Sequence, residues 1–131
     1  MNDVERYIAQ IDDLARRKKR YKSGAYHFIV EALEYTVKKT GERRHVSGAE
    51  LCWGIKDYAL EQFGPLAQTV FQHWGITETF DFGAIVYALI DEQLMKKTDE
   101  DSIEDFRGVY DLAEVFKPES YDFLASMGDE A

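Results

Sequence analysis

Residues 16–22, RRKKRYK, form the densest run of charge in the chain and the first candidate for chemistry. The cations are Arg16, Arg17, Lys18, Lys19, Arg20 and Lys22, and Tyr21 lies among them. Such a run could bind phosphates of RNA or DNA while the tyrosine ring stacks on a base. Other interpretations stay open: a solvated helix end, contact with an acidic protein surface, or docking onto the chain's own segment 99–105, DEDSIED.

Metal-binding and nucleophilic patterns are weak in this sequence. Cys52 is the single cysteine, which excludes an internal disulfide and a paired-cysteine zinc site. Because Cys52 follows Leu51 in an amphipathic pattern, we expect a small buried hydrophobe. Glu42 and His45 have the Glu-x-x-His spacing of di-iron helices, but such centres need a second copy. The acidic run 99–105 lacks the glycine and terminal glutamate of a calcium loop.

No serine elbow and no glycine-rich phosphate loop occurs in the chain. The segment FDFGAIVYALID, 80–91, contains the Asp-Phe-Gly of protein kinases, but the other kinase motifs are missing. Asp81 is therefore predicted to cap the start of a helix, where its oxygens accept backbone N–H groups. We expect no metal, no cofactor and no enzymatic activity.

Aromatic side chains are abundant and form a second group of candidates. They make up 14% of the residues, with eight tyrosines, eight phenylalanines and two tryptophans. Some of these rings could line a groove for a partner, since tyrosine and tryptophan are enriched at binding hot spots. The candidates for such an interaction surface are Trp53, Trp74, Phe106 and Tyr110. The alternative is that the rings fill a shared core.

Helical spacing of apolar residues runs through most of the chain. It predicts helices over 3–20, 24–40, 47–63, 65–74 and 81–93. The third begins with a capping box, in which Ser47 precedes Glu50 by three positions. Ser23 and Gly24 either separate the first two helices or lie inside one long helix.

After these helices, residues 94–98 and 107–112 are predicted to be two short strands flanking a polar loop. Three helices followed by a hairpin resemble a winged-helix domain. The predicted fold is mainly α, an N-terminal helical pair and a winged-helix-like centre with a short β-hairpin; the alternative is an all-α bundle. We expect one domain, 1–131, comprising a basic helical pair (1–45), an acidic centre (46–112) and a C-terminal tail (113–131) that packs back or is frayed.

The charge is divided unevenly along the chain. The net charge is −9, with +4 in residues 1–45 and −13 in residues 46–131. DNA phosphates would be repelled by the presumed recognition helix 81–93, which has no lysine or arginine, and by the acidic presumed wing. No apolar run approaches the ~20 residues that cross a bilayer, and the charged N-terminus is unlike a secretion signal. The sequence predicts a cytoplasmic protein without membrane contact.

Several blocks in order resemble the Minf family of uncharacterised bacterial proteins. They are AYHFIVEALEYTVKK, RRHVSGAELCWGIKDYALEQFG, WGI, DFGAIVYALID and KTDEDSIEDFRGVYDL, over roughly residues 21–116. The resemblance implies a bacterial protein and supplies no activity, cofactor or site residue. The sequence thus favours a protein–protein interaction module without catalysis, with an unknown partner or a second copy. A nucleic-acid-associated protein that uses residues 16–22 is the alternative.

Overall fold

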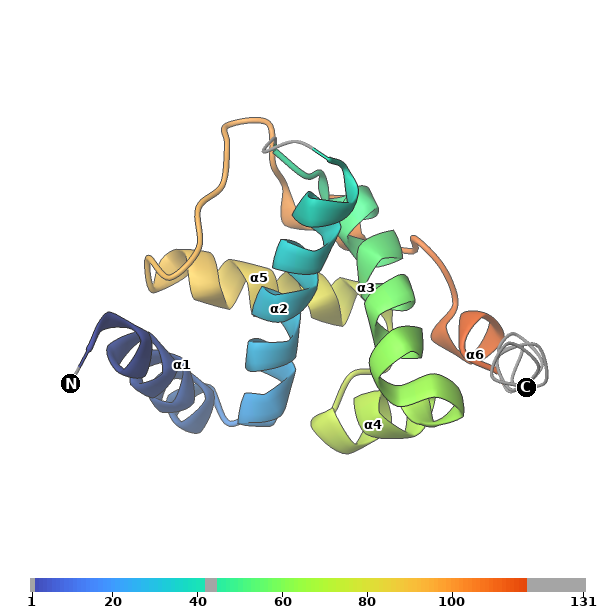
Figure 1. Cartoon of the computed structure of the whole chain (residues 1–131), viewed down its shortest axis with the longest axis horizontal. Helices are drawn as coiled ribbons and strands as arrows, with labels where there is room; N and C mark the ends of the chain where they lie inside the picture. Colours follow the sequence, from blue (N-terminus) through green and yellow to red (C-terminus); the bar gives the residue numbers. More distant parts are fainter. Residues whose placement is uncertain (1, 42–44, 118–131) are drawn as a thin grey trace.

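The computed structural model describes residues 2–41 and 45–117, and over these ranges the chain is helical with no strand (Figure 1). The N-terminal pair consists of α1 (Asp3–Lys18) and α2 (Ser23–Lys39). They are separate helices, because Lys19 adopts a left-handed conformation, φ 59°, and ends α1. The chain turns through residues 20–22, and α2 then runs through the centre of the molecule (Figure 1).

The next helix follows its predicted bounds closely, whereas the predicted helix 65–74 divides into a 3₁₀ turn and a shorter α-helix. Helix α3 (Gly48–Phe63) opens with the predicted capping box, since Ser47 and Glu50 each accept the other's backbone N–H. A 3₁₀ turn, η1 (Gly64–Leu66), leads into α4 (Ala67–Trp74). Gly75 ends α4 at φ 88°, a conformation that favours glycine.

Helix α5 (Thr79–Asp91) lies in the interior and packs against α2. Its buried residues include Phe82, Ile85, Val86 and Leu89. A recognition helix must present a polar face to a DNA groove. The burial of these residues agrees with the expectation, drawn from the charge pattern, that the helix over 81–93 does not contact DNA.

The predicted β-hairpin over 94–112 is also absent. In its place are a connector (92–102), a 3₁₀ turn η2 (Ile103–Phe106) and a short helix α6 (Leu112–Val115). Ser102 and Asp105 form another capping box, which coils the segment that a hairpin would use as its loop. Phe106, which follows, is 4% exposed, and its ring lies where a side chain on Gly83 would be. The all-α alternative fits.

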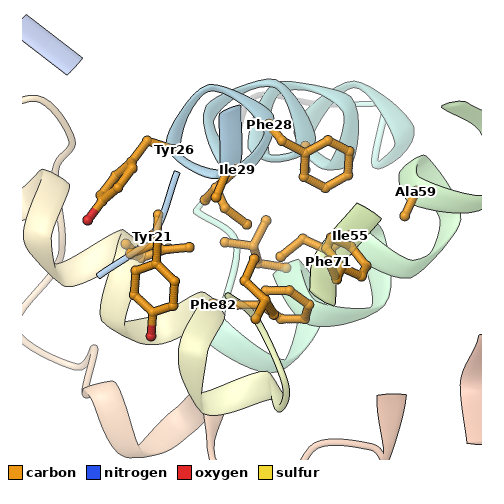
Figure 2. Close-up of a cluster of buried hydrophobic side chains, with 14 of the residues drawn as sticks. Tyr21, Tyr26, Phe28, Ile29, Ile55, Ala59, Phe71 and Phe82 are labelled. Carbon is orange, nitrogen blue, oxygen red and sulfur yellow. The ribbon is translucent and has the colours of Figure 1, made fainter. Parts of the chain in front are cut away.

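The core lies where α2, α3, α4 and α5 meet, and Figure 2 shows part of it. Phe28 of α2 packs edge-on against Phe71 of α4, with ring centroids 5.7 Å apart. Phe71 in turn contacts Phe82 of α5 at 5.5 Å and Phe116 at 5.3 Å. Most of the aromatic surplus thus fills the core, and Phe116, which follows α6, contributes to it.

The remainder of that tail, 118–131, lies outside the described residues, as do Glu42 and the rest of 42–44. Over the described ranges, none of the helices combines the length and apolar character that a bilayer crossing requires.

Candidate functional site

The cations of the basic run differ in their partners. Arg16 and Arg17, on the last turn of α1, both form ion pairs with Asp13. Arg17 also reaches Glu92 at the end of α5, with Nη1 3.0 Å from the carboxylate. The bond to Glu92, with that to Asp13, raises the pKa of Arg17, and the bond from Arg17, supported by Arg16, lowers the pKa of Asp13. These two arginines are therefore engaged within the molecule.

Arg20 and Tyr21, later in the run, both bond Asp81. Asp81 is 3% exposed, and its carboxylate accepts hydrogen bonds from the Tyr21 hydroxyl at 2.5 Å and from Arg20 at 3.2 Å. It also accepts the backbone N–H groups of Thr77 at 2.8 Å and Glu78 at 3.2 Å. Asp81 thus stabilises a helix start, as predicted, but as the third residue of α5 rather than the cap. Its contact between α5 and the corner that joins α1 to α2 was not predictable from the sequence.

Burial of Tyr21 overturns one part of the nucleic-acid hypothesis. Its ring is 5% exposed, and the pKa of its hydroxyl is raised by burial and by the bond to Asp81. A ring in this position cannot stack on a base. Figure 2 shows it among the core side chains.

Docking of the basic run onto the acidic segment 99–105 is also not what the structure shows. Asp101 and Glu104 of that segment bond residues outside the basic run. Asp101 bonds His45 at 2.7 Å and the Thr98 N–H at 2.8 Å, and Glu104 pairs with Arg107 at 2.6 Å. Internal docking of the run does occur, but through Asp13, Asp81 and Glu92.

Lys18, Lys19 and Lys22 are the cations of the run that remain exposed without an ion pair to any residue in 2–41 or 45–117. Two of them, Lys19 and Lys22, border an open hollow of about 620 Å³ at the corner between α1 and α2. We call it the basic hollow; it is lined by Asp12, Ala15, Arg16, Lys19, Arg20, Tyr21, Lys22, Ser23, His73, Trp74 and Gly75.

Segments far apart in the sequence build this hollow. The Lys22 backbone N–H bonds the carbonyl of Trp74 at 3.4 Å, which ties the corner to the end of α4. Gly75 lies close to the corner as well, since a Cβ there would be 3.1 Å from the Arg20 carbonyl oxygen. Gly75 therefore has two structural roles: it ends α4, and its lack of a side chain lets the Arg20 carbonyl lie close to it. The place of Gly75 after a helix was predictable from the sequence, but its contact with the Arg20 carbonyl was not.

The basic hollow is positively charged. Arg16, Lys19, Arg20 and Lys22 line it against a single carboxylate, Asp12, which bonds His27 at 2.7 Å. Cations that converge on one concave surface raise the local concentration of anions. The arrangement is suited to a carboxylate or phosphate group.

The four aromatic candidates have different surroundings. Trp53 is 45% exposed and packs against the half-buried Tyr110, with ring centroids 4.8 Å apart. The Tyr110 hydroxyl donates to the Cys52 carbonyl at 2.7 Å. Trp74 borders the basic hollow but packs on Phe28 at 5.4 Å. Phe106 is buried, so its ring is not available as a surface contact.

The cysteine and the metal-ligating side chains are the remaining candidates for chemistry. The Cys52 thiol is fully buried, as expected, and burial raises its pKa to about 12. Within 2–41 and 45–117, no group of three or more His, Cys, Asp or Glu side chains could hold a metal ion. Comparison with known proteins gives no match to a family model, to a curated protein or to a solved structure. The resemblance to the Minf family stays a prediction.

Proposed function

We propose that this chain is a small, non-catalytic cytoplasmic protein that binds an acidic segment of a partner protein in the basic hollow. The observation that carries the proposal is a hollow lined by four cations and one carboxylate in a chain whose net charge is −9. Two of the cations, Arg16 and Arg20, also pair with carboxylates that do not line the hollow. Lys19 and Lys22 lie at its border without a described acidic partner, so their charge is available to a ligand.

The size of the basic hollow favours a peptide over a long nucleic acid. A nucleic acid presents a continuous row of phosphates, and each one beyond the hollow needs its own cation. Residues 46–131 carry a balance of −13, and exposed Asp91 and Glu92 lie near α1 through the Arg17 pair. A few carboxylates on a short peptide can enter the hollow without approaching these groups.

The second candidate is a short nucleic-acid contact. Lys18 supports it, because this lysine extends the exposed positive charge along α1 beyond the hollow. Aromatic stacking on bases would not contribute to this contact, because Tyr21 is buried and Trp74 is packed against the core. Such a contact would rest on phosphate charge alone and would show no preference for base.

Binding of a fluorescently labelled hexaglutamate peptide at low salt, followed by anisotropy, tests the proposal. The lysines that line the hollow are changed in Lys19→Asn and Lys22→Gln. The matched control is Lys18→Gln, which removes the same charge from the same run outside the hollow. We expect the double variant Lys19→Asn/Lys22→Gln to weaken binding about tenfold, or about 1.4 kcal/mol, while the control stays within about twofold.

A labelled single-stranded oligonucleotide, titrated in parallel, separates the two candidates. Tighter binding of the oligonucleotide, with equal losses from Lys18→Gln and from either hollow variant, would favour the nucleic-acid contact. No binding of either polyanion to the wild-type protein would overturn both.

A further inference from the structure

A second cavity, separate from the basic hollow, lies beneath the connector 92–102. Its volume is about 190 Å³, and apolar side chains from α2, α3, α5 and the connector form most of its wall. These include Leu33, Val37, Leu51, Val86, Ile90 and Met95. We call this cavity the apolar pocket. The apolar pocket is partly open to solvent, and a mostly apolar concavity with a few polar groups is typical of small-molecule sites.

Hydrogen bonds hold the polar side of the apolar pocket in place. Asp101, which lines it, accepts from the Thr98 N–H at 2.8 Å and contacts His45 Nε2 at 2.7 Å. Asp105 accepts the Ser102 N–H at 3.1 Å. Because the connector is anchored at these points, it does not collapse into the space below.

One polar group at the apolar pocket lacks a partner. The Tyr87 hydroxyl is buried and makes no hydrogen bond to any residue that the structure describes. An unsatisfied buried hydroxyl costs about 1–3 kcal/mol. Burial raises the pKa of Tyr87, and the charges of Asp101 and Asp105 raise it further. The negative field at the hydroxyl favours a ligand group that donates hydrogen bonds.

We propose that the apolar pocket binds a small molecule with an apolar body, about the size of a substituted benzene ring, and one ammonium group. The apolar body fills the space between α2 and α5, and the ammonium group donates to the Tyr87 hydroxyl and the nearby carboxylates after a small rotation of their side chains. An apolar cavity of about 150 Å³ is large enough for benzene, and this one is slightly larger. Lys96, exposed at the mouth, is the group that would instead attract a carboxylate ligand.

Three probes with one shared ring distinguish these chemistries: benzylamine, toluene and benzoate. Binding is followed through the shifts of backbone amide NMR signals in the full chain. We expect benzylamine to bind best, toluene about fivefold more weakly, and benzoate most weakly. Tyr87→Phe removes the hydroxyl and should weaken benzylamine about fivefold while leaving toluene unchanged.

Val37→Phe fills the pocket and should weaken benzylamine and toluene more than tenfold, with circular dichroism confirming that the variant is folded. If Val37→Phe unfolds the protein, Val86→Leu, which adds one methylene to the same wall, is the replacement and should weaken the binding of both probes measurably.

If benzoate binds as tightly as benzylamine, the proposal that the ligand carries an ammonium group is wrong. Binding unchanged in the filled variant, or no amide shift for any probe at about 10 mM, would overturn the site. Competition with hexaglutamate is not expected, because the basic hollow shares no residue with the apolar pocket.

Discussion

Asp81 illustrates how one side chain can connect two parts of a fold. Asp81 is the first residue of the Asp-Phe-Gly triplet, and its carboxylate anchors the corner between α1 and α2. Gly83, the last residue of the triplet, leaves room for the Phe106 ring. The capping part of the role of Asp81 follows from its place before an apolar run. The long-range part does not, because Arg20 and Tyr21 are about sixty residues away in sequence.

Asp81→Asn is expected to destabilise the protein by about 2–4 kcal/mol, because an amide cannot accept all the bonds that the buried carboxylate accepts. Arg20→Gln should cost under about 1 kcal/mol, since the Arg20 side chain is 66% exposed and Asp81 keeps its other donors. Urea unfolding of the two variants measures both values. Equal losses would mean that the ion pair, rather than the Tyr21 and backbone bonds, anchors the corner.

Cys52 is predicted to be inert in the native state. Its thiol is buried and burial raises its pKa to about 12, so almost no thiolate exists at neutral pH. Reaction with a thiol reagent such as dithionitrobenzoate should be slow in buffer and fast in denaturant. Rapid reaction without denaturant would show that α3 opens locally.

Two helices approach closely at Gly54 of α3. A Cβ placed there would lie 1.8 Å from Oγ1 of Thr36 on α2, so the absence of a side chain sets the distance between these helices. Thr36 cannot rotate freely, because its hydroxyl bonds the Ala32 carbonyl at 2.7 Å.

Gly54→Ala should therefore destabilise the protein by about 1–3 kcal/mol through overpacking, even though alanine has a higher helix propensity than glycine. The double variant Thr36→Ala/Gly54→Ala should recover part of the loss relative to the sum of its single changes. Thermal unfolding of all four proteins gives the coupling energy. Strictly additive effects would contradict the proposed contact.

The connector is the element with the clearest dependence on pH. Partial burial pushes the pKa of Asp101 upward, but the bonds from Thr98 and His45 outweigh it, and the pKa lies below the ordinary value of 3.8. The stabilisation is thus present above pH 3.8 and is lost as the pH falls through the lowered value.

Hydrogen exchange at the Thr98 amide should therefore stay constant from neutral pH to about 4, after correction for intrinsic rates, and accelerate below that pH. In Asp101→Asn the protection should be weaker and should not change over this acid range. Wild-type protection that stays unchanged as the pH falls well below 3.8 would contradict this role of Asp101.

The elements also show where sequence reasoning succeeds and where it stops. Helix boundaries with local chemical causes were predictable: the Ser47–Glu50 capping box and the Gly75 exit involve only neighbouring residues. The hairpin prediction was wrong because residues 94–112 have no long helical repeat, and the capping box at Ser102 was not recognised. The basic run was found as a site candidate, but its partners could not be, since Glu92, Asp81 and the end of α4 meet it only through the tertiary fold.

At the scale of the whole molecule, salt is expected to act in opposite directions on stability and binding. The net charge of −9 makes the folded chain repel itself, and added salt screens that repulsion over a Debye length that shortens from about 20 Å to about 4 Å. Raising sodium chloride from about 0.02 M to about 0.5 M should increase the melting temperature slightly while it weakens hexaglutamate binding. A melting temperature that falls with salt would mean that ion pairs such as Arg17–Glu92 outweigh the net repulsion.

The placement of the two tryptophans provides an optical reporter for these experiments. Trp53 is solvent-exposed beside Tyr110, whereas Trp74 is wedged among Phe28, Phe63 and Phe71 and has one side on the basic hollow. The emission of Trp53 should accordingly be red-shifted and readily quenched by iodide, and that of Trp74 blue-shifted and shielded. In Trp53→Phe, any change in the remaining fluorescence on adding an acidic peptide reports on the hollow itself, so the native chain needs no attached dye.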